Sequence, residues 1–293
     1  MNRCIITTIL TLLALLPVQV MQAQRKDTDA KWEKQSTIHC RDRKVTDTAD
    51  VRILYAFNAL DIQDKDTWID EGQLKIGRNF TQYTSHFYEV NEDSLVNWLN
   101  AHPKSHVFPP GRWMQGHNPD HWIEYQHSDI EIRGNKLTEW ATMPAAIYNE
   151  NLYYTETLPL QAWDICDTTQ TVCGYECRKA TCSWRGRDYE AWFTTDIPLP
   201  AGPWKFGGLP GVIMKIGDAT GTYTWEAVGV DTGRFPVYAP RRSKYDESTR
   251  QKVLDLQRKL NENYFKTTGT TVIVFKTGLP CSSRKHPYTQ LEL

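Results

Sequence analysis

Runs in which apolar residues alternate with polar or charged ones dominate the chain between residues 51 and 230. In one of them, DYEAWFTTDI at 188–197, Tyr189, Ala191 and Phe193 fall on one face, because side chains of a strand point alternately to its two sides. This pattern is typical of antiparallel strands with one face wetter than the other. The aromatic content of 12% suits such half-buried strands.

Few segments have helical periodicity. The stretch 246–265 begins with acids and places Val253, Leu256 and Leu260 on one stripe, which predicts one long helix. A shorter helix is expected at 91–102, and a last strand at 270–275. The sum predicts a mainly-β or α+β fold, built on an antiparallel sheet with one long helix in the second half of the chain.

The beginning of the chain has the pattern of a secretory signal peptide. Arg3 precedes a short apolar run that Pro17 ends, and Ala23 offers a small residue for cleavage. We therefore expect residues 1–23 to be a signal peptide and the protein to be exported, to the periplasm or cell envelope.

The remainder contains no linker or internal repeat that would divide it. We expect a polar lead-in at 24–48 and one domain at 49–293. An insert at 102–129 is rich in His, Pro and Trp.

The charge balance excludes some partners. The whole chain carries 34 basic and 35 acidic residues, a net charge of −1, which argues against a dedicated nucleic-acid binder. No second apolar run approaches the length that spans a membrane, so no span is expected after signal cleavage.

Six of the seven cysteines lie beyond the expected signal peptide, and an even number in an exported chain suggests disulfides. If VCGYECRKATCSW is one strand, its cysteines are too far apart to pair with one another. Cys166 and Cys173 flank an expected turn, DTTQT, so a bond between them is the best single prediction. The other pairings stay open.

The stretch GPWKFGGLPGVI, 202–213, is unusual because it combines glycine pairs, prolines and aromatic residues with one charge. Leu209-Pro210-Gly211 predicts a type II turn, with Gly211 at the position that requires a positive φ. We interpret the stretch as a structural corner rather than a ligand site. The residues of this corner are Trp204, Phe206, Gly207, Gly208, Leu209, Pro210 and Gly211.

The same stretch resembles a known family. GGLPGVI, together with GYECRKA and RGRDYEAWFTTDIP upstream, is similar to the GLPGLI family, also called Porph_ging. The similarity extends to LKIGRNFTQYTS at 74–85 and to YTQLEL at 288–293. The resemblance implies an exported protein of unassigned function, with no catalytic residues to carry over. The strand pattern also resembles the antiparallel, half-open barrel of lipoprotein-carrier proteins that hold acyl chains, an analogy of fold alone.

Five histidines crowd into the insert, and they favour a transition-metal site as an alternative function. They are His102, His106, His117, His121 and His127. Prolines interrupt both HxxxH pairs, and neither pair contains the Glu of HExxH, so a solvated loop is the simpler interpretation.

No catalytic constellation or cofactor motif is present in the sequence. GxSxG, CxxC, GxGxxG and the P-loop are all absent, so no cofactor and no enzyme activity are expected. Arg185 and Arg187 in RGRD are expected to be solvated at a hairpin tip rather than to bind an anion.

These observations leave three hypotheses. The first is a non-enzymatic exported binding or carrier protein for an unknown apolar ligand or protein partner, which a large pocket lined by Trp and Tyr would support. The second is the metal-binding protein, and the third is a structural or assembly protein.

Overall fold

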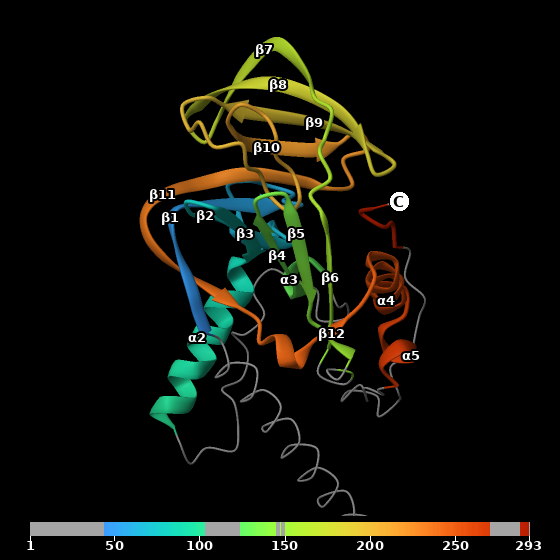
Figure 1. Ribbon diagram of the computed structural model, residues 1–293. Coiled ribbons are helices and arrows are strands. Elements are labelled where there is room, and N and C mark those ends of the chain that lie inside the picture. Colours follow the sequence, from blue (N-terminus) through green and yellow to red (C-terminus); the bar gives the residue numbers. More distant parts are fainter. Residues whose placement is uncertain (1–43, 103–123, 145–146, 148–149, 270–287, 293) are drawn as a thin grey trace, which may run out of the picture.

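The computed structural model describes residues 44–102, 124–144, 147, 150–269 and 288–292. In these residues the chain forms a twelve-stranded sheet with few helices (Figure 1). The strands are β1 (Lys44–Phe57), β2 (Asp70–Ile76), β3 (Phe80–Ser85), β4 (Ser128–Arg133), β5 (Lys136–Ala141), β6 (Leu152–Thr157), β7 (Asp164–Val172), β8 (Tyr175–Trp184), β9 (Arg187–Thr194), β10 (Val212–Asp218), β11 (Thr224–Ala239) and β12 (Asp246–Glu247).

The order across the sheet is β12-β6-β5-β4-β3-β2-β1-β11-β10-β9-β8-β7. All neighbours pair antiparallel except β12, which runs parallel to β6. The predicted mainly-β, antiparallel fold is confirmed. The sheet is open, with β7 and β12 at its edges, and does not close into a barrel.

Two-residue turns connect β7, β8 and β9, one at each end of β8. Cys173 and Gly174 link β7 to β8, and Arg185 and Gly186 link β8 to β9, with φ positive at all four residues. Positive φ at both central residues is the signature of the turn that matches the twist of antiparallel strands. The predicted hairpin tip at RGRD is therefore present.

The sheet curves around an aromatic core. The Tyr55 hydroxyl of β1 donates to the Ile213 carbonyl of β10 over 2.8 Å, although β11 lies between these strands. Within the curve, Phe206 contacts four rings at centroid distances of 4.8–5.7 Å, those of Tyr189, Trp204, Trp184 and Trp225. The inner face is thus filled by side chains of the chain itself.

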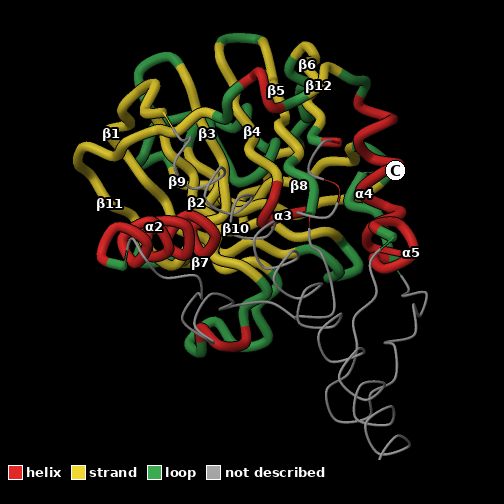
Figure 2. The backbone as a smooth tube through the Cα atoms, turned by 90° about the horizontal axis from the view of Figure 1, so that it is seen from below, coloured by secondary structure: helices red, strands yellow, loops and turns green. Residues whose placement is uncertain are grey.

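The helices lie at the sides of the sheet (Figure 2). They are α2 (His86–Ala101), α3 (Glu124–His127), α4 (Arg250–Glu262) and α5 (Tyr264–Thr268), with short 3-10 turns η1 (Lys65–Thr67) and η3 (Arg242–Lys244). Helix α2 begins five residues before the expected start because the Ser85 side chain accepts the Tyr88 N–H as its cap. The expected helix 246–265 begins only at Arg250, capped by Thr249, and Asn263 separates α4 from α5.

Several expectations fall outside the described residues. These are the signal peptide at 1–23, most of the lead-in, most of the His-rich insert and the strand at 270–275. The end of the lead-in, 44–48, already belongs to β1. Among the helices that the structure describes, none combines the length and apolar character needed to cross a bilayer.

Candidate functional site

The corner 202–211 lies in the loop between β9 and β10. Trp204, Phe206 and Leu209 are buried in the main core, while Gly208 and Pro210 are exposed. Trp204 stacks on Trp225 of β11, with centroids 6.2 Å apart and planes 11° apart.

The expected type II turn with a positive φ at Gly211 is wrong. The positive φ values of the loop belong to Trp204 (52°) and Gly208 (83°). Gly211 is needed for a different reason: a Cβ there would lie 1.9 Å from the Thr194 carbonyl oxygen. Gly207 also serves close packing, since it bridges to Ala201.

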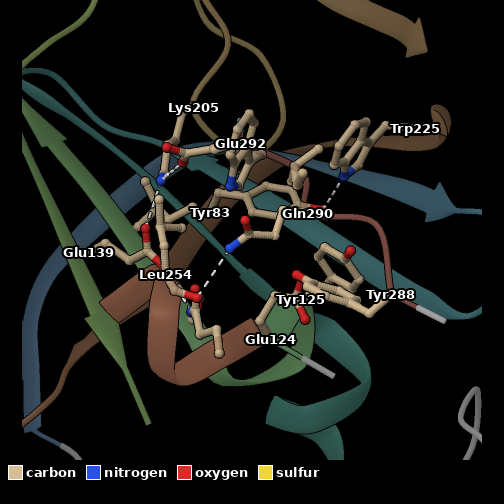
Figure 3. A pocket seen from close by; sticks show the side chains of 15 residues that line it. Tyr83, Glu124, Tyr125, Glu139, Lys205, Trp225, Leu254, Tyr288, Gln290 and Glu292 are labelled. Atoms are coloured by element: carbon tan, nitrogen blue, oxygen red, sulfur yellow. Dashed lines mark hydrogen bonds and ion pairs between the residues drawn. The ribbon is translucent and has the colours of Figure 1, made fainter. Parts of the chain in front are cut away.

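Lys205, the only charged residue of this corner, is buried at 1% exposure. Its Nζ lies 2.7 Å from Glu139 Oε2 of β5 and donates to the Tyr154 hydroxyl of β6 over 2.8 Å. It also pairs with the carboxylate of Glu292. The loop between β9 and β10 therefore carries an ammonium group into the space between the sheet and the segment Tyr288–Glu292 (Figure 3).

Glu292 is held by two more cations. Arg185 of the β8–β9 turn and Arg250 of α4 both pair with its carboxylate. Burial acts to raise the pKa of Glu292, but the charges of Lys205 and Arg185 outweigh it and lower the pKa to about 2. The Glu292 side chain is therefore a carboxylate, enclosed by positive charge.

Arg185 and Arg187 are not the solvated turn residues that the sequence predicts. The side chain of Arg185 is 11% exposed and bonds Glu156 at 2.8 Å in addition to Glu292. The side chain of Arg187 is 7% exposed and pairs with Asp218 at 2.9 Å. The turn itself is at the surface, but the curve of the sheet directs both side chains inward.

The backbone of the segment is also bound. Arg187 donates from Nε to the Leu291 carbonyl over 3.0 Å and from Nη2 to the Gln290 carbonyl. The Tyr223 hydroxyl donates to the Thr289 carbonyl. Side chains of the body therefore bind three successive carbonyl groups of the segment.

The other end of the segment meets a buried acid. Tyr288 donates its hydroxyl to Glu124 of α3, which also accepts from Asn261 of α4 over 2.6 Å. Burial raises the pKa of Glu124, although these hydrogen bonds oppose the rise. Figure 3 shows Tyr288 beside Tyr125 and Glu124, and Glu292 at the far end beside Lys205.

We call the side chains that hold Tyr288–Glu292 the segment site. They are Glu124, Arg185, Arg187, Lys205, Tyr223 and Arg250. A pocket remains between the segment, α4 and the rings of Trp204 and Trp225, and its space for water-sized molecules is about 30 Å³. That volume suits about two waters and gives no room for an acyl chain.

The expected disulfide between Cys166 and Cys173 is not formed. The four described cysteines, Cys166, Cys173, Cys177 and Cys182, are free thiols. DTTQT is not a turn, because β7 continues through it to Val172. Cys166 and Cys173 are thus about 20 Å apart along one extended stretch, too far for a bond. The turn instead lies at Cys173-Gly174, so the cysteine-rich run is not one strand. Cys40 and Cys281 lie outside the described residues.

The structure describes two of the five histidines. His127 contacts the ring of Tyr88 in the first turns of α2, and His102 stacks on Trp98 in its last turn. Ten helical residues separate Tyr88 from Trp98, a rise of about 15 Å, so these two histidines do not converge. Within the described ranges no three His, Cys, Asp or Glu side chains gather as a metal site. His106, His117 and His121 lie outside those ranges.

Comparison with protein families tests the resemblance that the sequence motifs indicated. Residues 185–215 match the family described as "Protein of unknown function (Porph_ging)". The Porph_ging resemblance is confirmed. This Porph_ging stretch contributes Arg185, Arg187 and Lys205 to the segment site, so its charged residues bind the segment that YTQLEL supplies.

Comparison with solved structures gives distant matches. No curated protein matches the chain significantly. Two structures of PNGF-II, in the C2 and P21 space groups, are similar with a TM-score of 0.45 each and sequence identities of 17% and 16%. The matches cover 78% and 72% of this chain and 34% of PNGF-II in both cases, so this chain spans about a third of the length of those structures.

Lys205, the only charged residue of the corner, could have indicated this site from the sequence. A charge in an otherwise apolar and glycine-rich stretch is buried with a partner more often than it is left without one. The acidic residue that pairs with it lies in YTQLEL, and nothing in the spacing of the two motifs indicates that they meet.

Proposed function

We propose that the protein is an exported, non-enzymatic binding protein whose segment site holds an extended peptide. The observation that carries this proposal is the way in which Tyr288–Glu292 is bound. Carbonyl oxygens of Thr289, Gln290 and Leu291 accept from side chains of the body, and an acidic side chain is enclosed by three cations.

The chemistry of the site supports binding more than catalysis. Lys205 lies between two carboxylates and a phenol, and its Nζ contacts all three. The arginines are paired with Glu156, Asp218 and Glu292. Such a set positions and neutralises a carboxylate.

A carrier of apolar ligands receives less support. The inner face of the sheet is filled by aromatic rings, and the pocket beside the segment has space for about two waters. Peptide binding keeps the binding role that the sequence suggests and replaces the apolar ligand by a polar, extended one.

Export is part of the proposal because residues 1–23 have the pattern of a signal peptide. Fractionation of cells that express the full chain tests this part. We expect the protein in the periplasmic or envelope fraction, with residues 1–23 removed, and a full-length cytoplasmic product would contradict it.

The binding role is tested by cutting the chain between the body and the segment. A protease site is introduced within 270–287, and the purified protein is cleaved. An isotope-labelled peptide of sequence YTQLEL, residues 288–293, is then added. Native mass spectrometry measures whether the cleaved segment stays bound and exchanges with the labelled peptide.

Exchange that saturates with peptide concentration supports a binding site. The labelled peptide should fail to bind the Lys205→Met variant. The matched control is Tyr189→Phe, which removes a hydroxyl without a partner and should bind the peptide normally. If the cleaved protein unfolds, or if the segment never exchanges, the segment is a permanent part of the fold. The third hypothesis, a structural or assembly protein, would then be favoured.

A further inference from the structure

The segment site contacts the side chains of some residues of Tyr288–Glu292 and only the backbone of others. Leu291 and Glu292 are 5% and 2% exposed, whereas Thr289 is exposed and only its carbonyl is bound. Tyr288 is half-buried, with its hydroxyl on Glu124. The side chain of Gln290 donates to the Leu254 carbonyl of α4 over 3.3 Å. The contacts therefore select an aromatic residue with a hydroxyl, then one permissive position, then Gln, Leu and Glu.

The charge of the site requires an anion. Lys205, Arg185 and Arg250 supply three positive charges around Glu292, and the remaining carboxylates paired with them are Glu139 and Glu156. Without Glu292, one positive charge is left in excess in a buried space. Leaving a buried charge unpaired is costly, so any other occupant must bring a negative group.

The Tyr189 hydroxyl is buried and has no hydrogen-bond partner. Tyr189 lies on the same face of β9 as Arg187, which binds the Gln290 and Leu291 carbonyls. An unpaired buried hydroxyl is rare and unfavourable.

We propose that the segment site binds an acidic segment of another protein, with the pattern aromatic-x-Gln-Leu-Glu, and that Tyr288–Glu292 is its tethered competitor. The inference rests on the proposed peptide-binding function and adds the partner class. Because Tyr288–Glu292 belongs to the same chain, it competes with any added peptide in an intramolecular equilibrium. An external peptide therefore binds the intact chain only weakly, and binds better when the competitor is weakened.

Fluorescence anisotropy of labelled peptides tests this on the full chain. The probes are YTQLEL, YTQLQL, ATQLEL and a peptide of the same composition in permuted order. The protein variants are Glu292→Gln and Leu291→Ala, which weaken the competitor by different contacts, and Thr289→Ala, a control at an exposed side chain. We expect YTQLEL to bind Glu292→Gln and Leu291→Ala about tenfold or more tightly than the wild type or Thr289→Ala.

The inference and the underlying function fail in different ways. Equal binding of YTQLEL, YTQLQL and the permuted peptide would overturn the acidic partner but keep a peptide site. No binding of any peptide to either variant at millimolar concentration would overturn the peptide-binding function as well. If Glu292→Gln binds no added peptide and instead forms dimers, the occupant is a second copy of the chain and the inference is also wrong.

Discussion

Lys205 and Glu292 lie 87 positions apart in the sequence, yet their side chains form an ion pair in which each is 1% exposed. Lys205 belongs to the loop before β10 and Glu292 to the segment that lies against α4. Because Glu139 shares the same ammonium group, loss of Lys205 would leave Glu139 buried without its cation, while Glu292 would keep Arg185 and Arg250.

Substitution of Lys205 tests how much this pairing stabilises the fold. We expect Lys205→Met to lower the free energy of unfolding by about 3–5 kcal/mol, measured by urea denaturation, because breaking a buried ion pair leaves its partner charged and unpaired. Lys215→Met is the matched control. Lys215 pairs with Glu226 at 2.7 Å with side chains 41% and 31% exposed, and its loss should cost about 1 kcal/mol or less. Similar losses in both variants would contradict the buried-pair assignment.

Acid should weaken the binding of Tyr288–Glu292 to the body, because it protonates the Glu292 carboxylate. The folded pKa of this carboxyl, about 2, lies below its ordinary value of 4.5. Its contribution is therefore fully present above pH 4.5 and is lost as the pH falls towards 2. The difference in unfolding free energy between wild type and Glu292→Gln should shrink over this window, by about 3 kcal/mol at most. A difference that does not change between pH 5 and 2.5 would show that the pKa is not lowered.

Glu124 should have the opposite pH dependence. Its folded pKa is raised by burial, so above pH 4.5 the folded state binds more protons than the unfolded state, and stability falls as the pH rises through that range. Glu124→Gln should remove this fall and stabilise the protein at pH 8 relative to wild type, because the amide can keep hydrogen bonds to Tyr288 and Asn261. Thermal melts at pH 5 and pH 8 measure it, and a Glu124→Gln variant less stable than wild type at pH 8 would contradict it.

Two glycines of the corner should respond differently to alanine. At Gly211 a Cβ would lie 1.9 Å from the Thr194 carbonyl oxygen, so Gly211→Ala should cost about 3 kcal/mol or prevent folding. At Gly208 the space is open and only the φ of 83° opposes a side chain, so Gly208→Ala should cost about 1–2 kcal/mol. Denaturant melts of the pair provide the comparison, and equal costs would contradict it.

The described cysteines should react with an alkylating reagent at very different rates. Cys173 is exposed, whereas Cys177 and Cys182 are buried and burial raises their pKa to about 11 and about 12. Alkylation of the native protein at pH 8, followed by mass spectrometry, should label Cys173 first and the buried pair only after denaturation. A mass deficit of about 2 Da that involves Cys166 or Cys173 would instead indicate a disulfide.

The periodic parts of the fold could be predicted without coordinates. The alternation in 188–197 placed Tyr189, Ala191 and Phe193 on one face, and all three are buried on β9. Element ends were less predictable: α2 starts at His86 because Ser85 caps it, and β7 continues through a run of Asp, Thr and Gln that has the composition of a turn. Local patterns give the element type, while caps and pairing partners set its limits.

The candidate site could not be predicted, because its members come from distant parts of the chain. In the sequence, Arg185 and Arg187 have the pattern of solvated turn residues, and Lys205 has no evident partner. The curve of the sheet brings all three side chains to the segment. Strand alternation depends on neighbours within a few positions, so the sequence was sufficient for the antiparallel sheet, whereas Gly211 is required by the Thr194 carbonyl of β9. The pairing of Lys205 with Glu292 depends on long-range burial, in which desolvation is balanced only when both charges are enclosed together. The fold alone brings those two charges into contact.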